Sequence, residues 1–167
     1  MKMQLFKFLY QINVWQSMVI VCLLSSPWFV YLLMTPNNHT KAILWAYTAL
    51  SYFLLSFLLY IFLRLISNLG QTSIRKKIVT FTRIFIRFHV AMAILGVTSI
   101  LFHIVHMLGE GWGQTVSGVS GFLAVCALIP LLVTGYLRKK KSSGKRRRFH
   151  RYAAYIFLIF VLIHMFL

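Results

Sequence analysis

The sequence is almost without acidic residues. Glu110 is the single acid among 167 residues, whereas 18 residues are lysine or arginine, so the formal net charge is +17. With 60% hydrophobic residues and a mean hydropathy of +0.80, the composition excludes an ordinary soluble domain and indicates an integral membrane protein. The basic residues lie between apolar runs and not along an amphipathic face, which argues against nucleic acid as a partner.

Cysteine and proline are also scarce. The two cysteines, Cys22 and Cys126, lie within apolar runs and are expected to be small buried residues. Pro27 and Pro130 lie within apolar runs as well, and each is expected to kink a helix. A neighbouring helix or the hydroxyl of Ser26 is expected to meet the carbonyl that Pro27 leaves without a donor.

Five apolar runs are long enough to cross a bilayer. They predict an all-α protein, an integral membrane bundle of five transmembrane helices that forms a single domain over residues 1–167. The runs cover approximately residues 14–34, 43–65, 84–108, 116–137 and 150–167, and the last is short unless His150 and Arg151 are included. The first run follows Lys2 and Lys7 like a signal peptide, but its length and the missing cleavage site before Pro27 favour a retained helix.

The lysines and arginines predict the orientation of the spans. Two precede the first span, six lie within residues 64–87, nine lie within residues 138–151, and Lys41 is the remaining one. The positive-inside rule then places the N-terminus and both basic loops in the cytoplasm, facing anionic lipid, and the C-terminus outside a plasma membrane. Tryptophans near the ends of spans are expected to anchor them at the interface: Trp15, Trp45 and Trp112.

Four of the six histidines form two pairs with one spacing. His89 and His103 are fourteen residues apart, as are His150 and His164. At about 100° per residue, both members of a pair face the same side of a helix, roughly 21 Å apart along its axis. One member then lies near each edge of a hydrocarbon core about 30 Å thick. Since the third and fifth spans run in the same direction, His89 shares the cytoplasmic level with His150, and His103 shares the outer level with His164.

This pattern is typical of a membrane cytochrome with two haems. Two neutral imidazoles fill both axial positions of a haem iron, which then transfers electrons and keeps no open position for oxygen. Since the sequence has no Cys-x-x-Cys-His motif, noncovalent haem b is expected. Arginines near the inner histidines are candidate partners for the propionates: Arg83, Arg87, Arg147, Arg148 and Arg151. The candidate propionate partners near the outer histidines are weaker: Lys41, His39, His106, Trp112 and the loop at residues 109–115.

Two further residues lie midway between the paired histidines. Gly96 is seven residues from both histidines of the first pair, and Phe157 is seven from both of the second. Glycine would let a porphyrin edge approach the backbone, and phenylalanine would fill the space between two haems. Ordinary helix packing is the alternative for both residues.

Packing is the alternative for the histidines as well. A histidine in a membrane helix often bonds to the backbone or a hydroxyl of a neighbouring helix, and this alternative weighs most for His106. His39, in the turn after the first span, is expected to be an ordinary loop residue.

The sequence around the paired histidines resembles a known family. The segments that begin with Arg87-Phe88-His89 and Arg148-Phe149-His150 are similar to the ferric reductase-like transmembrane superfamily. That group includes the membrane domains of NADPH oxidases and ferric reductases, and the haem-binding subunit of a bacterial methionine sulfoxide reductase system. The resemblance covers roughly residues 43–167 and implies two haems b between the third and fifth helices, with Phe157 as an aromatic residue between them.

The chain departs from this family in two respects. The family core usually has six helices, and no glycine-rich fingerprint for a nicotinamide or flavin nucleotide occurs here. Small di-haem cytochromes that oxidise quinol are similar through the same histidine spacing. The donor to the inner haem is therefore expected to be a quinol or a separate protein.

The predicted function is electron transfer across the membrane, from a quinol or cytoplasmic flavoprotein to an acceptor at the outer face. His106 and Glu110 are candidate proton acceptors at a quinol site. Two alternatives stay open: a non-catalytic membrane subunit that binds haem or quinone to anchor a partner enzyme, and a haem-free packing or transport protein. Whether the chain is itself an enzyme also stays open.

Reporter fusions test the predicted orientation. Fusions after Gly70 and after Ser143 should report the cytoplasm, and fusions after Gly111 and at the C-terminus should report the outside, because seventeen of the 18 basic residues require it. Labelling of a Ser143→Cys variant by an impermeant thiol reagent in intact cells would contradict this orientation.

Overall fold

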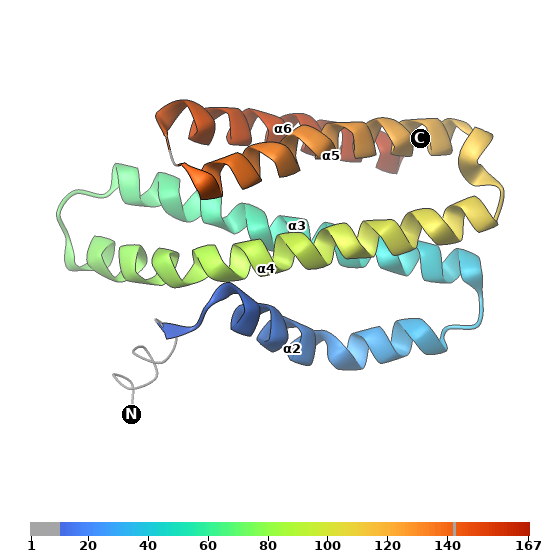
Figure 1. Ribbon diagram of the computed structural model, residues 1–167, viewed down its shortest axis with the longest axis horizontal. Helices are drawn as coiled ribbons and strands as arrows, with labels where there is room; N and C mark the ends of the chain where they lie inside the picture. The colour runs from blue at the N-terminus through green and yellow to red at the C-terminus, as the bar shows by residue number, and fades with distance from the viewer. Residues whose placement is uncertain (1–10, 142) are drawn as a thin grey trace. The chain divides into compact units, whose positions relative to one another are not determined.

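The computed structural model describes residues 11–141 and 143–167, and these residues form helices and turns without strands. The five long helices are α2 (Val14–Met34), α3 (Asn38–Asn68), α4 (Ser73–Gly109), α5 (Val116–Lys140) and α6 (Gly144–Phe166), and a short 3₁₀ helix, η1 (Trp112–Gln114), precedes α5 (Figure 1). All five are long and apolar enough to cross a membrane. The prediction of an all-α, multi-pass membrane protein with five spans is confirmed. Lys2 and Lys7, which contribute to the predicted orientation, lie outside the described residues.

Four helices begin or end beyond the predicted spans, whereas α2 matches its span at both ends. α4 starts at Ser73, where the apolar run starts at Ile84, and α6 starts at Gly144, where the predicted span starts at His150. These additional helical turns contain many of the lysines and arginines found in segments 64–87 and 138–151. Hydropathy marks where a helix enters hydrocarbon, but its backbone hydrogen bonds continue into the polar headgroup region.

Polar residues cap the starts of four helices. Asn13 forms a capping box with Gln16 at the start of α2, with both hydrogen bonds shorter than 3.0 Å. At the starts of α3, α5 and α6 the capping side chains are Asn37, Thr115 and Ser143. Because Asn37 caps α3, His39 lies in the first helical turn, and its predicted loop position is wrong.

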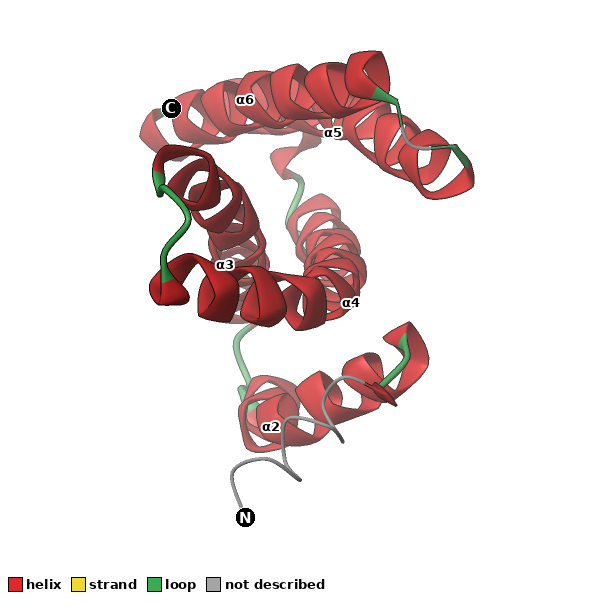
Figure 2. Ribbon diagram, turned by 90° about the vertical axis from the view of Figure 1, so that its left-hand side faces the viewer, coloured by secondary structure: helices red, strands yellow, loops and turns green. Residues whose placement is uncertain are grey.

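The chain divides into two compact units. One ends at Met107 and contains α2, α3 and most of α4, and the other spans Leu108–Leu167 and contains η1, α5 and α6. In the first unit α3 and α4 are antiparallel, as the colours along the chain show (Figure 1), and in the second α5 and α6 are antiparallel and lie side by side (Figure 2). The single domain expected over residues 1–167 stays a prediction.

Side-chain hydrogen bonds and ring contacts join α3 to α2 within the first unit. Trp28 Nε1 donates to Thr48 Oγ1 over 2.8 Å, and the Tyr52 hydroxyl donates to Ser25 Oγ over 2.6 Å. The ring of Trp45 is only 6% exposed and stacks on rings of both α2 and α4. Its predicted role as an interfacial anchor is therefore wrong, because neighbouring aromatic rings enclose it.

The proline and cysteine predictions have different outcomes. Ser26 Oγ donates to the carbonyl of Leu23 over 2.8 Å, which is the carbonyl that Pro27 leaves without a donor, as expected. Cys126 is exposed and Cys22 is partly exposed, so the expected burial is wrong for Cys126. A small apolar side chain in a membrane span can face lipid at little cost, so its position in the span did not determine its burial.

A close backbone contact joins η1 to the first turn of α5. A Cβ atom added at Gly118 would lie 2.1 Å from the carbonyl oxygen of Trp112 and 3.0 Å from backbone atoms of Gly113. Since both obstacles are backbone atoms, they cannot rotate away as a side chain could. Only glycine fits at residue 118 with this connection.

Substitution of Gly118 should therefore destabilise the second unit. Gly118→Ala is expected to cost about 1–3 kcal/mol, the usual penalty of overpacking, measured as a lower thermal unfolding temperature in detergent. Gly109→Ala is the matched control, because no atom lies within 4 Å of a Cβ there. Equal unfolding temperatures for the two variants would contradict the contact.

Candidate functional site

In the first unit, both paired histidines of α4 hydrogen-bond to backbone carbonyls of α3. His89 Nδ1 lies 2.9 Å from the oxygen of Ser56, and His103 Nδ1 lies 2.8 Å from the oxygen of Ala42. A carbonyl oxygen can only accept, so Nδ1 of each ring carries the proton. The lone pair of each ring is then on Nε2, as required for a neutral imidazole that binds a metal through that atom.

In the second unit, both paired histidines hydrogen-bond to hydroxyls of α5. His164 Nδ1 lies 3.0 Å from Ser120 Oγ, and His150 Nδ1 lies 3.3 Å from Thr134 Oγ1. Each hydroxyl already donates its own proton to a carbonyl of α5, over 2.9 Å and 2.7 Å respectively. The hydroxyls therefore accept from Nδ1, and these two rings have the same tautomer as the rings of α4.

The hydrogen-bond partners repeat the spacing of the histidines. Ala42 and Ser56 are fourteen residues apart on α3, and Ser120 and Thr134 are fourteen apart on α5. Because the helices of each pair are antiparallel, equal spacing places a partner beside the histidine at both levels. Each unit therefore holds two histidines on one helix, with the same nitrogen engaged by the neighbouring helix.

A glycine follows each of the two hydroxyl residues. A Cβ added at Gly121 would lie 3.0 Å from Cε1 of His164, and one added at Gly135 would lie 3.3 Å from Cε1 of His150. The backbone of α5 thus lies against the ring edge beside the nitrogen that its hydroxyl binds. Glycine is what permits this close approach.

The two residues predicted midway between the histidines are both buried. A Cβ at Gly96 would lie 3.2 Å from the ring of Phe53, so the missing side chain makes room for an aromatic ring of α3. Phe157 is 6% exposed on α6. Helix packing accounts for the contact at Gly96, and a porphyrin contact at either residue stays a prediction.

The two predicted arginines are in different surroundings. Arg87 is half-buried, and its Nη1 donates to the carbonyl of Ile12, just before α2. Arg151 is exposed on α6 directly after His150. Arg87 lies two residues before His89 and Arg151 directly follows His150, and the interaction of both arginines with propionates stays a prediction.

The two candidate proton acceptors lie at the end of α4. His106 is half-buried in the last turn of the helix, and Glu110 is exposed in the turn that follows. Among residues 11–141 and 143–167, no three His, Cys, Asp or Glu side chains converge on one point. The candidate site consists of histidines in pairs, and haem iron takes only two axial protein ligands.

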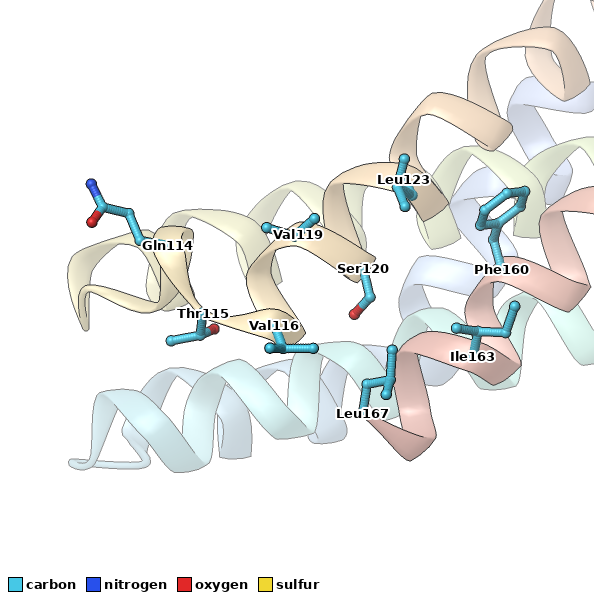
Figure 3. A pocket seen from close by; sticks show the side chains of 9 residues that line it. All are labelled: Gln114, Thr115, Val116, Val119, Ser120, Leu123, Phe160, Ile163 and Leu167. Atoms are coloured by element: carbon cyan, nitrogen blue, oxygen red, sulfur yellow. The ribbon is translucent and has the colours of Figure 1, made fainter.

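An apolar groove of about 440 Å³ lies between the start of α5 and the end of α6 (Figure 3). Valine, leucine, isoleucine and phenylalanine side chains form most of its lining. Ser120 also borders the groove, so the hydroxyl that binds His164 lies at its wall. Its lining supplies apolar contact and few polar groups.

Neither hydroxyl partner is expected from the sequence, where residues 117–121 indicate only close helix contact. A signal was nevertheless present, because Ser120-Gly121 and Thr134-Gly135 repeat a hydroxyl residue and a glycine at the histidine spacing. The carbonyl partners on α3 have no such signal, since every residue carries a carbonyl.

No protein-family model, curated protein or solved structure matches the chain. The resemblance to the ferric reductase-like superfamily stays a prediction.

Proposed function

We propose that the protein is a membrane cytochrome that binds two haems b through His89, His103, His150 and His164 and moves electrons across the membrane. The observation that carries this proposal is the common state of the four imidazoles. Each donates Nδ1–H to the adjacent helix, so each has its lone pair on Nε2. Metal-bound histidines are usually oriented in this way by a hydrogen bond at the other ring nitrogen.

Helix packing alone does not call for this uniformity. A packed histidine can donate from either nitrogen, and its tautomer follows from whichever partner is near. Here the donating nitrogen is Nδ1 at all four positions, although the acceptors differ between backbone and side chain. The same tautomer at four positions with different acceptors favours one shared requirement, a lone pair on Nε2 of each ring.

The donor set fits haem b. When bound, haem b would supply a one-electron couple suited to electron transfer. The histidines would hold the iron, and basic residues near the cytoplasmic histidines would pair with propionates, with Arg151 as the exposed candidate. From the order and orientation of the spans alone, we assign His89 and His150 to the cytoplasmic haem and His103 and His164 to the outer haem.

The proposed electron path needs partners on both sides. The sequence has no nucleotide-binding fingerprint, so we propose a quinol or a cytoplasmic flavoprotein as donor and an acceptor at the outer face. The basic loop at residues 138–151 would attract an acidic donor protein. We place the N-terminus in the cytoplasm and the protein in the plasma membrane on the positive-inside rule.

Haem counting in histidine variants tests the ligands. The wild-type chain should bind two haems, and each single alanine variant of the four histidines should keep one, because the other pair of ligands is intact. His106→Ala is the control and should keep two. Pyridine haemochrome assays per chain, with size-exclusion chromatography to verify folding, give the count. Two haems retained in all four single variants would refute the assignment.

Double variants test which histidines share a haem. His103→Ala combined with His164→Ala should keep one haem, because both substitutions affect the same level. His103→Ala combined with His150→Ala should keep none, since each level loses a ligand. The reverse result would reassign the pairs while leaving the four ligands in place.

Reduction assays test the proposed donors. NADPH alone should not reduce the purified protein, whereas a quinol analogue or an added flavoprotein should, with haem absorbance as the readout. Rapid reduction by NADPH without a partner would contradict the proposal. If His106→Ala or Glu110→Gln keeps two haems but loses reduction by the quinol analogue, the donor is a quinol that uses that residue.

A further inference from the structure

The two units orient their histidines with different chemical groups. On α3 the acceptors are peptide carbonyls, which cannot donate and which substitution of a side chain does not remove. On α5 the acceptors are the hydroxyls of Ser120 and Thr134, which can donate or accept after rotation. Two specific side chains therefore help to orient His150 and His164, and His164 also hydrogen-bonds to the backbone of Ser117.

We propose that Ser120-Gly121 and Thr134-Gly135 are duplicated positioning elements that hold His164 and His150 as Nε2 ligands and set the reduction potential of each haem separately. This inference rests on the proposed function, because it assigns haems to these histidines. It adds residues that touch neither haem iron nor substrate and act through the ligands.

A second hydrogen bond keeps each hydroxyl in its accepting orientation. The Ser120 hydroxyl donates to the carbonyl of Ser117, and the Thr134 hydroxyl donates to carbonyls of Pro130 and Leu131, over 2.7 and 3.0 Å. Rotation toward the histidine would break these bonds and would move the ring proton to Nε2. Ser120 is only 6% exposed, so little water can replace this bond, although the carbonyl keeps the backbone N–H donor of its helix.

A hydrogen bond from Nδ1 also changes the electronic character of the ligand. Donation from Nδ1 makes the imidazole more basic at Nε2, which favours ferric over ferrous iron. The bond from His164 to Ser120 is 3.0 Å, whereas the bond from His150 to Thr134 is 3.3 Å. Loss of the serine hydroxyl should therefore have the larger effect.

The glycines fix the position of the rings. A methyl group at Gly121 would meet His164 Cε1 at 3.0 Å, closer than carbon atoms normally approach, so the ring or the helix would have to move. The corresponding distance at Gly135 is 3.3 Å, which leaves more room. Alanine should consequently disturb His164 more than His150.

Redox titration of the haem-loaded chain tests the hydroxyls. Ser120→Ala should raise the potential of the haem bound by His164, and Thr134→Val that of the haem bound by His150. We expect the preference for ferric over ferrous iron to fall by up to roughly tenfold, which corresponds to a rise of about 59 mV in a one-electron potential. The change should be smaller in Thr134→Val. Thr134→Ser retains the hydroxyl and should restore the wild-type potential.

Ser51→Ala and Thr98→Val are the matched controls. Each removes a hydroxyl that donates to a carbonyl of its own helix, as Ser120 and Thr134 do, but on an exposed face. Both controls should keep both potentials. Unchanged potentials in Ser120→Ala and Thr134→Val, or equal shifts in the controls, would overturn the proposal.

A measurement without haem separates this inference from the proposed function. In the full chain produced without haem, ¹⁵N NMR of the histidines should show Nδ1 protonated in the wild type. Ser120→Ala should shift the Nδ1 resonance of His164 alone, because that nitrogen loses one of its partners, while the resonances of His89 and His103 stay unchanged. Failure of the chain to bind haem would end the proposed function, whereas an unchanged His164 resonance would overturn the positioning role.

Glycine variants provide a test by spectroscopy. Gly121→Ala should shift the low-spin EPR signal of the haem bound by His164 or release that haem, and Gly135→Ala should have a smaller effect on the other haem. Gly144→Ala is the control, because no atom lies within 4 Å of a Cβ there. An EPR spectrum and haem content unchanged in Gly121→Ala would contradict the steric part of the proposal.

Discussion

The hydrogen bond from histidine Nδ1 to the neighbouring antiparallel helix is the constraint on which the arrangement depends. A bilayer interior has no water to replace such a bond, so an unpaired ring nitrogen or carbonyl there is costly. The bond therefore stabilises each helix pair, and it also fixes the tautomer of the ring. A relative slide of one residue moves a helix by about 1.5 Å and would stretch the bonds at both levels together. Helix packing and the orientation of the imidazole rings thus have the same origin.

Much of the fold could be predicted because a bilayer imposes simple rules on composition and length. The five spans follow from apolar runs, α2 matches its predicted limits, and the hydroxyl of Ser26 meets the carbonyl left by Pro27. The ends of the other helices could not be obtained from hydropathy. Capping residues such as Asn37 and Ser143 determine where α3 and α6 begin, and these positions do not coincide with the edge of the apolar run.

The candidate site was predictable to the extent that it depends on periodicity. Spacing alone placed both histidines of each pair on one helix face, but it could not identify what lies beside them. Packing between helices decided the surroundings of Trp45 and Cys126, which differ from expectation because single-helix patterns do not specify neighbours. The repeated hydroxyl-glycine pairs on α5 were visible in the sequence, yet their meaning requires the contact with α6.

The equal intervals on facing helices have a consequence for how this sequence can vary through evolution. Between His89 and His103, apolar residues can exchange for one another as long as lipid and neighbouring helices accept them. One inserted or deleted residue in that interval is different, because it turns one histidine by about 100° relative to the other. No exchange of side chains elsewhere would correct both ends. Selection should therefore preserve the number of residues between the histidines more strictly than the identity of those residues. A distant relative would keep the fourteen-residue spacing on four helices even where little sequence identity remains.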